Sequence, residues 1–224
     1  MGHCRSLTCN ERSVAESIFR GSVPLSDVEI VVRARLYGGF TPYGTINVGP
    51  ESYAADYIAP TLATAPRADL VEDAHFFLHE MTHVWQHFVG MPVALAWARA
   101  RAEGRRVLRR SGKPRFAFYR DAATYAYSIT SDRADLLDYN MEQQCEIVAD
   151  YFAHRLWGKA LAANSFNVFG YPTPSPDELR SVLGRFLSDP AYPSREPGLW
   201  HARARFRRHG AAEEGDEDEC DDAE

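Results

Sequence analysis

Residues 75–90, which read HFFLHEMTHVWQHFVG, constrain the fold more than any other segment of the chain. They belong to a stretch over 67–89 whose apolar residues recur with helical periodicity, and Gly90 predicts the end of this helix. Apolar side chains surround the histidines of the segment (Phe77, Leu78, Met81, Val84 and Trp85). We therefore expect the helix to pack in the core, where imidazoles need hydrogen-bonding or metal partners because unpaired polar burial is costly.

Capping residues and turn signals predict the other elements. Three helix starts carry a capping box, in which Thr, Asn or Ser precedes Glu or Gln by three positions (Thr8–Glu11, Asn140–Gln143 and Ser175–Glu178). Short runs rich in β-branched or aromatic residues predict strands. The expected helices cover 8–21, 67–89, 91–110, 140–157 and 175–188, and the expected strands cover 27–36, 41–50 and 125–129. This mixture predicts an α+β fold that is mainly helical with a small sheet.

The charge distribution divides the chain into a body and terminal segments. The 224 residues carry a net charge of −6, but residues 213–224 hold nine acids and no base. Of the 31 acids and 25 bases in the chain, 22 acids and all 25 bases remain in the rest of it, a charge of +3. We expect a flexible N-terminus over 1–7, one domain over 8–200, a basic segment over 201–212 and a disordered acidic tail over 213–224.

The sequence also bears on where the protein is made. It contains no apolar run of about eighteen residues, so no membrane span is expected. The first residues lack the apolar core of a secretory signal, and the four cysteines are too scattered for a disulfide framework. We expect synthesis in the cytoplasm without a signal peptide, so that any export would need a specialised secretion system.

The motif HEMTH, within the predicted helix over 67–89, has the spacing of a catalytic metal site. Residues four apart lie on the same face of a helix, so His79 and His83 can bind one ion. Zinc accepts imidazole nitrogens and in catalytic sites keeps a position for water. Glu80 flanks the pair and can accept a proton from that water. The alternative interpretation is two structural histidines whose hydrogen bonds are satisfied.

A third metal ligand is expected from the predicted helix over 140–157. Its segment EIVAD places Glu146 and Asp150 on one helical face, so that one carboxylate can complete the zinc site while the other orients a ligating histidine. Glu142 lies on this face too, but it is in the first turn, where acids commonly favour the helix dipole. We therefore favour Glu146 over Glu142, with an ordinary exposed acidic face as the alternative to both.

The two motifs together resemble those of the gluzincin metallopeptidases. In that family both histidines of H-E-x-x-H and the glutamate of the second motif bind zinc. The glutamate of the first motif is the general base, and the aspartate that follows supports a histidine. The resemblance implies Zn²⁺ bound by His79, His83 and Glu146, with Glu80 as the catalytic base and Asp150 as the supporting residue.

Longer stretches of the chain are similar to small bacterial zincin domains described as Vgr-related or Rhs-associated. These stretches are ERSVAESIFRGSVPLSDVEIVV, FTPYGTINVGP, HFFLHEMTHVWQH and YNMEQQCEIVADYF. The resemblance implies a compact zincin-like domain, built around an active-site helix that carries H-E-x-x-H. It also implies that the short strand TINVG is an edge strand that aligns an extended peptide, and that the protein is connected with a bacterial secretion system or a toxin.

The remaining histidines and the tyrosines have less defined roles. A metzincin would need Gly at position 86 and His at 89, but the chain has Gln86 and Val89, which excludes that class. His75 and His87 diverge from the pair in opposite directions around the helix, so we expect them to lie outside the metal site. The candidates for a side chain that stabilises the transition state are tyrosines near the second motif (Tyr125, Tyr127 and Tyr139).

These observations predict a zinc metallopeptidase that hydrolyses peptide bonds in a protein or peptide substrate, as an effector linked to a secretion system. The alternative is a non-catalytic zincin-fold module that binds other components of a secretion apparatus. The basic stretch over 99–115 is expected to be a solvated helix face. No nucleic-acid-binding motif accompanies it, so we expect no nucleic-acid partner.

Overall fold

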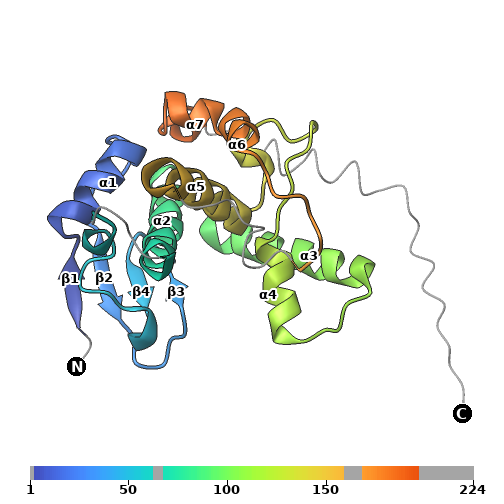
Figure 1. The fold of residues 1–224 in the computed structure, drawn as a ribbon, viewed down its shortest axis with the longest axis horizontal. Coiled ribbons are helices and arrows are strands. Elements are labelled where there is room, and N and C mark those ends of the chain that lie inside the picture. Colours follow the sequence, from blue (N-terminus) through green and yellow to red (C-terminus); the bar gives the residue numbers. More distant parts are fainter. Residues whose placement is uncertain (1–2, 63–67, 159–167, 197–224) are drawn as a thin grey trace, which may run out of the picture.

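The computed structural model describes residues 3–62, 68–158 and 168–196, and it is mainly helical with one small sheet (Figure 1). The α+β class predicted from the sequence is confirmed. The strands are β1 (Cys4–Ser6), β2 (Glu29–Val32), β3 (Gly39–Phe40) and β4 (Ile46–Val48). The helices are α1 (Cys9–Phe19), α2 (Ala68–Phe88), α3 (Val93–Ser111), α4 (Ala117–Tyr125), α5 (Met141–Trp157), α6 (Pro176–Val182), α7 (Gly184–Ser188) and α8 (Tyr192–Arg195), with short 3₁₀ turns at Pro50–Ser52, Ala59–Leu62 and Leu136–Asp138. The predicted basic segment over 201–212 and acidic tail over 213–224 lie outside the described residues.

The N-terminal segment is built into the fold. Residues 4–6, expected to be part of a flexible terminus, form β1, which pairs with β2. The predicted capping box of α1 is confirmed, since Thr8 and Glu11 exchange hydrogen bonds. Glu11 is fully buried and also receives two hydrogen bonds from the Arg5 guanidinium, at 2.7 and 2.8 Å. This buried pair fixes β1 against α1, a long-range contact that three residues of strand do not reveal on their own.

The four-stranded sheet has the order β1-β2-β4-β3. β2 and β4 are parallel, with Ile30 opposite Ile46, whereas β1 and β3 join the sheet as antiparallel outer strands. The segment TINVG was expected to be an edge strand, but that expectation is wrong because β4 lies inside the sheet. The outer strand on this side is β3, two residues long, and its second side has no strand partner in the described part of the chain.

Helices α2 and α5 form the centre of the molecule and lie side by side over most of their length (Figure 1). The apolar face of α2 is buried against the sheet and α5, and includes Phe77, Leu78 and Met81. Asn140 caps α5 as predicted, with its side chain accepting from the backbone of Glu142 and Gln143, and Gly158 ends the helix in the left-handed region with a φ of 65°. Every residue of α5 from Met141 to Ala153 is buried.

Helices α3 and α4 form a pair beside this centre. The sequence predicted a strand over 125–129, but Tyr125 is the last residue of α4 and no strand follows it. The helix is favoured here by packing. Gly104 of α3 lies so close to Thr124 that a Cβ at position 104 would come within 2.5 Å of the Thr124 hydroxyl. The contact fixes α4 up to its end at Tyr125, and residues 126–129 continue without pairing to any strand in the described part of the chain.

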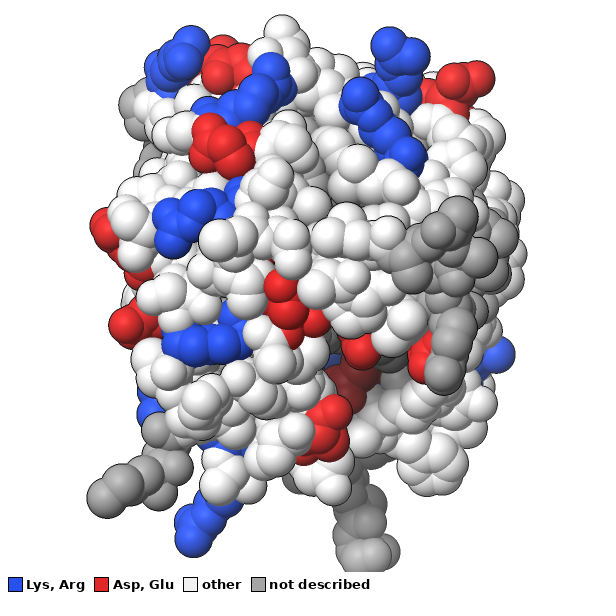
Figure 2. Space-filling model, turned by 60° about the vertical axis from the view of Figure 1, so that its left-hand side comes forward, with Lys and Arg blue, Asp and Glu red and all other residues white. Residues whose placement is uncertain are grey.

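The last described helices close the core at one end. The predicted helix over 175–188 is divided into α6 and α7, and its capping box between Ser175 and Glu178 is confirmed. The indole of Trp85 on α2 donates a 2.8 Å hydrogen bond to the carbonyl of Pro190. None of the helices in the described ranges combines the length and the apolar character that a membrane span needs. Figure 2 shows basic and acidic side chains interspersed on one face of the molecule, with acidic ones around a hollow.

Candidate metal centre

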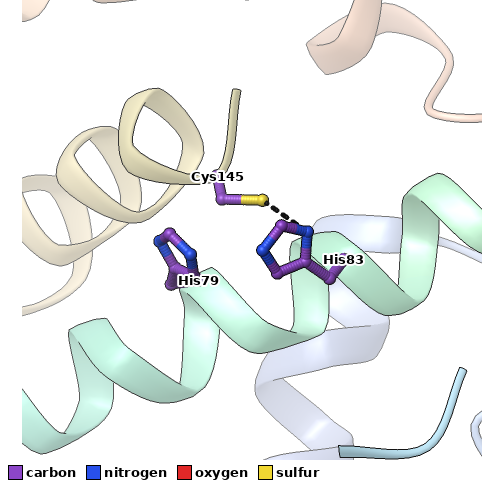
Figure 3. Close-up of side chains that lie close together, drawn as sticks. All are labelled: His79, His83 and Cys145. Atoms are coloured by element: carbon purple, nitrogen blue, oxygen red, sulfur yellow. Dashed lines mark hydrogen bonds between the residues drawn. The ribbon is translucent and has the colours of Figure 1, made fainter. Parts of the chain in front are cut away.

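The two motif histidines project from α2 toward α5. His79 and His83 lie one helical turn apart with their ring centroids 5.0 Å apart, and both are almost completely buried. Figure 3 shows them beside Cys145 of α5, whose sulfur lies 3.3 Å from Nδ1 of His83. Together, His79, His83 and Cys145 place possible ligand atoms within 4.8 Å of one another, so this cluster could hold a metal ion.

Glu142 is the carboxylate between the two imidazoles. Its Oε2 atom lies 3.1 Å from Nε2 of His83 and 3.4 Å from Nε2 of His79. Donor atoms around a tetrahedral zinc ion are roughly 3.3 Å apart, given bonds of about 2.0 to 2.1 Å. Both distances from this oxygen to the imidazole nitrogens are therefore those expected between ligands of one metal ion. Burial would raise the pKa of Glu142, but His83 and His79 outweigh that effect and hold it well below its usual range.

A chain of side-chain amides fixes the orientation of His83. Gln144 donates from Nε2 to the carbonyl of Tyr139 at 2.8 Å, so its Oε1 atom is the acceptor that faces Gln86. Gln86 in turn donates from Nε2 to this Oε1 and to the carbonyl of Met141. Its own Oε1 therefore faces Nδ1 of His83, at 2.8 Å, and an amide oxygen can only accept. Nδ1 of His83 therefore carries a hydrogen in this arrangement, so that Nε2, the atom that faces Glu142, is the nitrogen available to a metal ion.

This orientation separates Cys145 from the Nε2 side of His83. The sulfur lies next to Nδ1, on the opposite side of the imidazole ring from Glu142. Burial raises the pKa of the Cys145 thiol, and the carboxylates of Glu142, Glu80 and Glu146 raise it further. The Oε2 atom of Glu142, in contrast, lies within 3.4 Å of Nε2 on both histidines. The geometry therefore favours Glu142 over Cys145 as the partner of the two histidines.

Glu146, which we predicted to be the third ligand, lies instead beside the other nitrogen of His79. Its Oε1 atom is 2.9 Å from Nδ1, while the Nε2 atom of His79 faces Glu142. The oxygen is displaced from the direction of a hydrogen bond, so Nδ1 is buried without one. Burial lowers the pKa of His79, but Glu142 and Glu146 outweigh it and hold this pKa well above its usual value. Glu146 therefore contacts His79 through charge, on the side of the ring away from Glu142.

Asp150 also has a different partner from the one expected, which was a histidine of the metal site. Its carboxylate lies 2.9 Å from Nε2 of His75 and accepts a 2.6 Å hydrogen bond from the Tyr127 hydroxyl. His75, expected to lie outside the metal site, thus has a buried carboxylate partner on α5. His75, Glu146 and Asp150 form a second group of potential ligand atoms. The three acids on α5 follow one another at four-residue intervals, so the observed contacts differ from the predicted ones by one helical turn.

Glu80 lies between α2 and the edge of the sheet. Its Oε2 atom accepts a 2.6 Å hydrogen bond from the Thr41 hydroxyl, in a buried position. The backbone of β3 approaches so closely that a Cβ at Gly39 would lie 2.1 Å from Oε1 of Glu80. Glycine is therefore required at position 39 for this approach. The contact with Thr41 and Gly39 carries no signal in the sequence, because it depends on where β3 pairs.

The structure distinguishes among the three candidate tyrosines. The hydroxyl of Tyr127 donates to Asp150, and that of Tyr139 donates to the carbonyl of Arg133. The ring of Tyr125, in contrast, lies 5.7 Å from that of His79. Burial raises the pKa of Tyr125, and the carboxylates of Glu142, Glu80 and Glu146 raise it further. Its hydroxyl therefore stays protonated next to the motif residues.

A component of a bacterial secretion system is similar to a large part of the chain. The chain is 32% identical over 158 residues to the type VI secretion system spike protein VgrG2b of Pseudomonas aeruginosa (strain PAO1). The matched region covers 63% of this chain, and the chain spans 14% of the length of VgrG2b. No family model and no solved structure matches the chain. The similarity supports the Vgr part of the resemblance seen in the sequence, while the gluzincin part stays a prediction.

Proposed function

We propose that this protein is a zinc-dependent metallopeptidase. The observation that carries the proposal is the position of Glu142, whose carboxylate lies 3.1 and 3.4 Å from the Nε2 atoms of both motif histidines. With Glu80 one residue after the first histidine, these contacts support a site of three ligands and a base, the combination that catalytic zinc sites use.

In this proposal His79, His83 and Glu142 hold the ion. Glu146, which the sequence predicted to be a ligand, would instead orient His79. Two imidazoles and a carboxylate are a donor set that zinc accepts, and the buried Nδ1 atom of His79 has a carboxylate at 2.9 Å. When bound, zinc would polarise the peptide carbonyl and lower the pKa of a coordinated water.

Glu80 is the residue that would move the proton. Its Oε2 atom accepts a hydrogen bond from Thr41, which fixes the carboxylate, and Glu80 would accept a proton from the attacking water. The protonated Glu80 would then deliver this proton to the leaving amine. Tyr125, buried and protonated beside His79, is the candidate donor to the developing oxyanion.

Substitution of the base tests the mechanism. Glu80→Gln should lower the cleavage rate of a peptide library by about 10²- to 10⁴-fold, the usual contribution of a positioned base, while the zinc content measured by elemental analysis stays the same. Glu16→Gln, an exposed residue of α1, is the matched control and should cleave at the wild-type rate. If Glu80→Gln also cleaves at the wild-type rate, the mechanism is wrong.

We further propose that the peptidase works with a type VI secretion system, as an effector exported by it. The similarity to a part of the VgrG2b spike supports this connection. The same similarity favours one alternative, a zincin-fold module with no catalytic activity that assembles with the secretion apparatus. A zinc content below about 0.2 per chain after gentle purification would favour the alternative, because three-ligand zinc sites hold their metal tightly.

A further inference from the structure

A depression of about 570 Å³ lies beside β3 and β4. Its lining includes Arg33, Arg35, Phe40, Tyr43 and Asn47. Phe40 and Asn47 are opposite each other in the pairing of β3 with β4, so their side chains share one face of the sheet. Asn47 holds this face together, because it donates to the carbonyl of Phe40 and accepts a 2.7 Å hydrogen bond from Nε of Arg33.

The preceding residue of β3 faces the other way. Gly39 is opposite Val48, which is completely buried in the core, and it contacts the carboxylate of Glu80. Gly39 and Phe40 are successive residues of β3, so the first faces Glu80 and the second faces the depression. The side chains of a peptide that pairs with the free side of β3 would also point alternately to the two faces of the sheet. If one of its residues lies over Glu80, the next side chain along the peptide enters the depression.

The chemistry of the depression is cationic with aromatic walls. Arg33 and Arg35 are both exposed, and neither forms an ion pair with any described residue of the chain. Phe40 and Tyr43 are 53% and 75% exposed, which is unusual for large apolar side chains away from a partner. A guanidinium pairs well with a carboxylate in two parallel hydrogen bonds, and the rings would cover the aliphatic part of the bound side chain.

We infer that this depression is a substrate subsite for an acidic side chain, Asp or Glu, located within two residues of the cleaved bond. The inference rests on the proposed peptidase function, since the strand that would align the substrate is the one that contacts Glu80. Arg33 and Arg35 then determine specificity and take no part in bond cleavage.

Profiling of cleavage sites in a proteome-derived peptide library tests the subsite. The zinc-loaded wild type should cleave peptides with Glu near the bond about five to ten times faster than those with Gln, the range expected for a charge-assisted hydrogen bond at a partly exposed site. Arg35→Glu should abolish this preference or turn it toward Lys and Arg. Arg33→Gln should reduce it, and Arg12→Glu, an exposed arginine of α1, should retain it.

A binding measurement separates the subsite from the chemistry. Fluorescein-labelled nonapeptides with Glu or Gln at the centre are titrated with Glu80→Gln protein, with and without Arg35→Glu, and followed by anisotropy. Cleavage without a preference for acids overturns the subsite and leaves the peptidase intact. Absence of cleavage together with binding of the Glu peptide that depends on Arg35 overturns the peptidase, and with it the substrate subsite, and leaves the depression as a binding site for acidic peptides. Equal binding of the two peptides overturns the subsite.

Discussion

Helices α5 and α3 both carry many charged and polar residues, but they place them in opposite environments. In α5 every residue from Met141 to Ala153 is buried, including Glu142, Glu146 and Asp150. In α3 the buried residues are small or apolar (Ala100, Gly104 and Leu108), while five arginines are exposed to solvent or nearly so (Arg99, Arg105, Arg106, Arg109 and Arg110). A charge in water needs no partner, whereas a buried charge is costly unless it is paired.

The difference teaches where to look for function in a chain of this kind. The charges of α3 can be explained by solubility alone, as the sequence predicted for the basic stretch over 99–115. Those of α5 each have a specific partner on α2 or nearby, and hydrophobic residues would fill the same positions at a lower cost. Their retention is the strongest physical argument that the α2–α5 contact is a site, and substitutions in the two helices can test it.

The largest effect should separate Glu142 from Glu146. Glu142→Gln removes a ligand in our assignment, so zinc affinity should fall by more than about 100-fold, whereas Glu146→Gln removes an orienting contact and should cost about 10- to 100-fold. Zinc affinity is measured by competition with a chromogenic chelator. The reverse order of the two losses would restore Glu146 as the ligand and contradict the assignment based on the distances to Nε2 of the histidines.

The amide chain should give the next effect. Gln86→Leu removes the acceptor at Nδ1 of His83. At a pH above the raised pKa of this imidazole, the neutral ring of the metal-free protein should then become a mixture of tautomers, and zinc affinity should fall by about 10- to 100-fold. The tautomer is measured from the ¹⁵N chemical shifts of the His83 ring. Gln86→Glu, which keeps an acceptor, should restore the Nδ1–H form. Gln143→Leu, which loses the contact with the carbonyl of Ala126 and the capping-box hydrogen bond from Asn140, should not change the tautomer; if it does, the amide chain has no special role.

A smaller effect is expected in the pH dependence of stability. In the metal-free protein the lowered pKa of Glu142 stabilises the fold at pH values above 4.5, the ordinary pKa of a glutamate. This stabilisation is lost as the pH falls through the lowered pKa. The raised pKa values of His79 and His83 stabilise the fold at pH values below 6.5, the ordinary pKa of a histidine. This stabilisation is lost as the pH rises through the raised pKa values. The site therefore contributes most between pH 4.5 and 6.5. With zinc bound the trend above pH 6.5 should reverse, because zinc needs neutral imidazoles.

Urea unfolding of wild type and Glu142→Gln at several pH values measures this contribution. The difference in the free energy of unfolding between the two metal-free proteins should be largest between pH 4.5 and 6.5 and should decrease on either side. A difference that does not change with pH would mean that Glu142 and the histidines are not paired in the metal-free protein.

The smallest effect should come from α3. Arg101 lies 3.2 Å from Asp121 of α4, but both side chains are partly exposed. Arg101→Gln should therefore change the free energy of unfolding by less than about 0.5 kcal/mol and leave zinc affinity unchanged. Thermal unfolding and chelator competition measure both quantities. A loss as large as that of the α5 variants would remove the distinction between the two helices.

The sequence predicted the elements whose signals are local. Capping boxes located the starts of α1, α5 and α6, and periodicity located α2 to within about one residue. It did not predict β1 or β3, which have three and two residues and depend on their pairing partners. The strand expected over 125–129 was wrong because Tyr125 belongs to α4 and residues 126–129 pair with no strand in the described part of the chain. Local preferences cannot reveal such contacts.

The candidate site was also predicted only where its signal is local. The spacing of HEMTH alone brings His79 and His83 to one face, and the structure places them together. The register between α2 and α5, however, depends on packing over the whole length of both helices. Glu142, Glu146 and Asp150 are equivalent in spacing, so the sequence could not decide which one faces Nε2 of the histidines. Gln86 and Gln144 were missed because their roles depend on each other.

The two halves of the proposed zinc site are far apart in the chain, since Glu142 follows His83 by 59 residues. During folding, therefore, an ion that arrives early could be held only by the pair on α2, and full affinity would appear only after α5 has docked. Once bound, the ion would act as a cross-link over this long loop and reduce the conformational entropy of the unfolded chain. Removal of zinc would then weaken the attachment of α5 to α2 as well as activity, so that a protease would cut the segment between the two helices first.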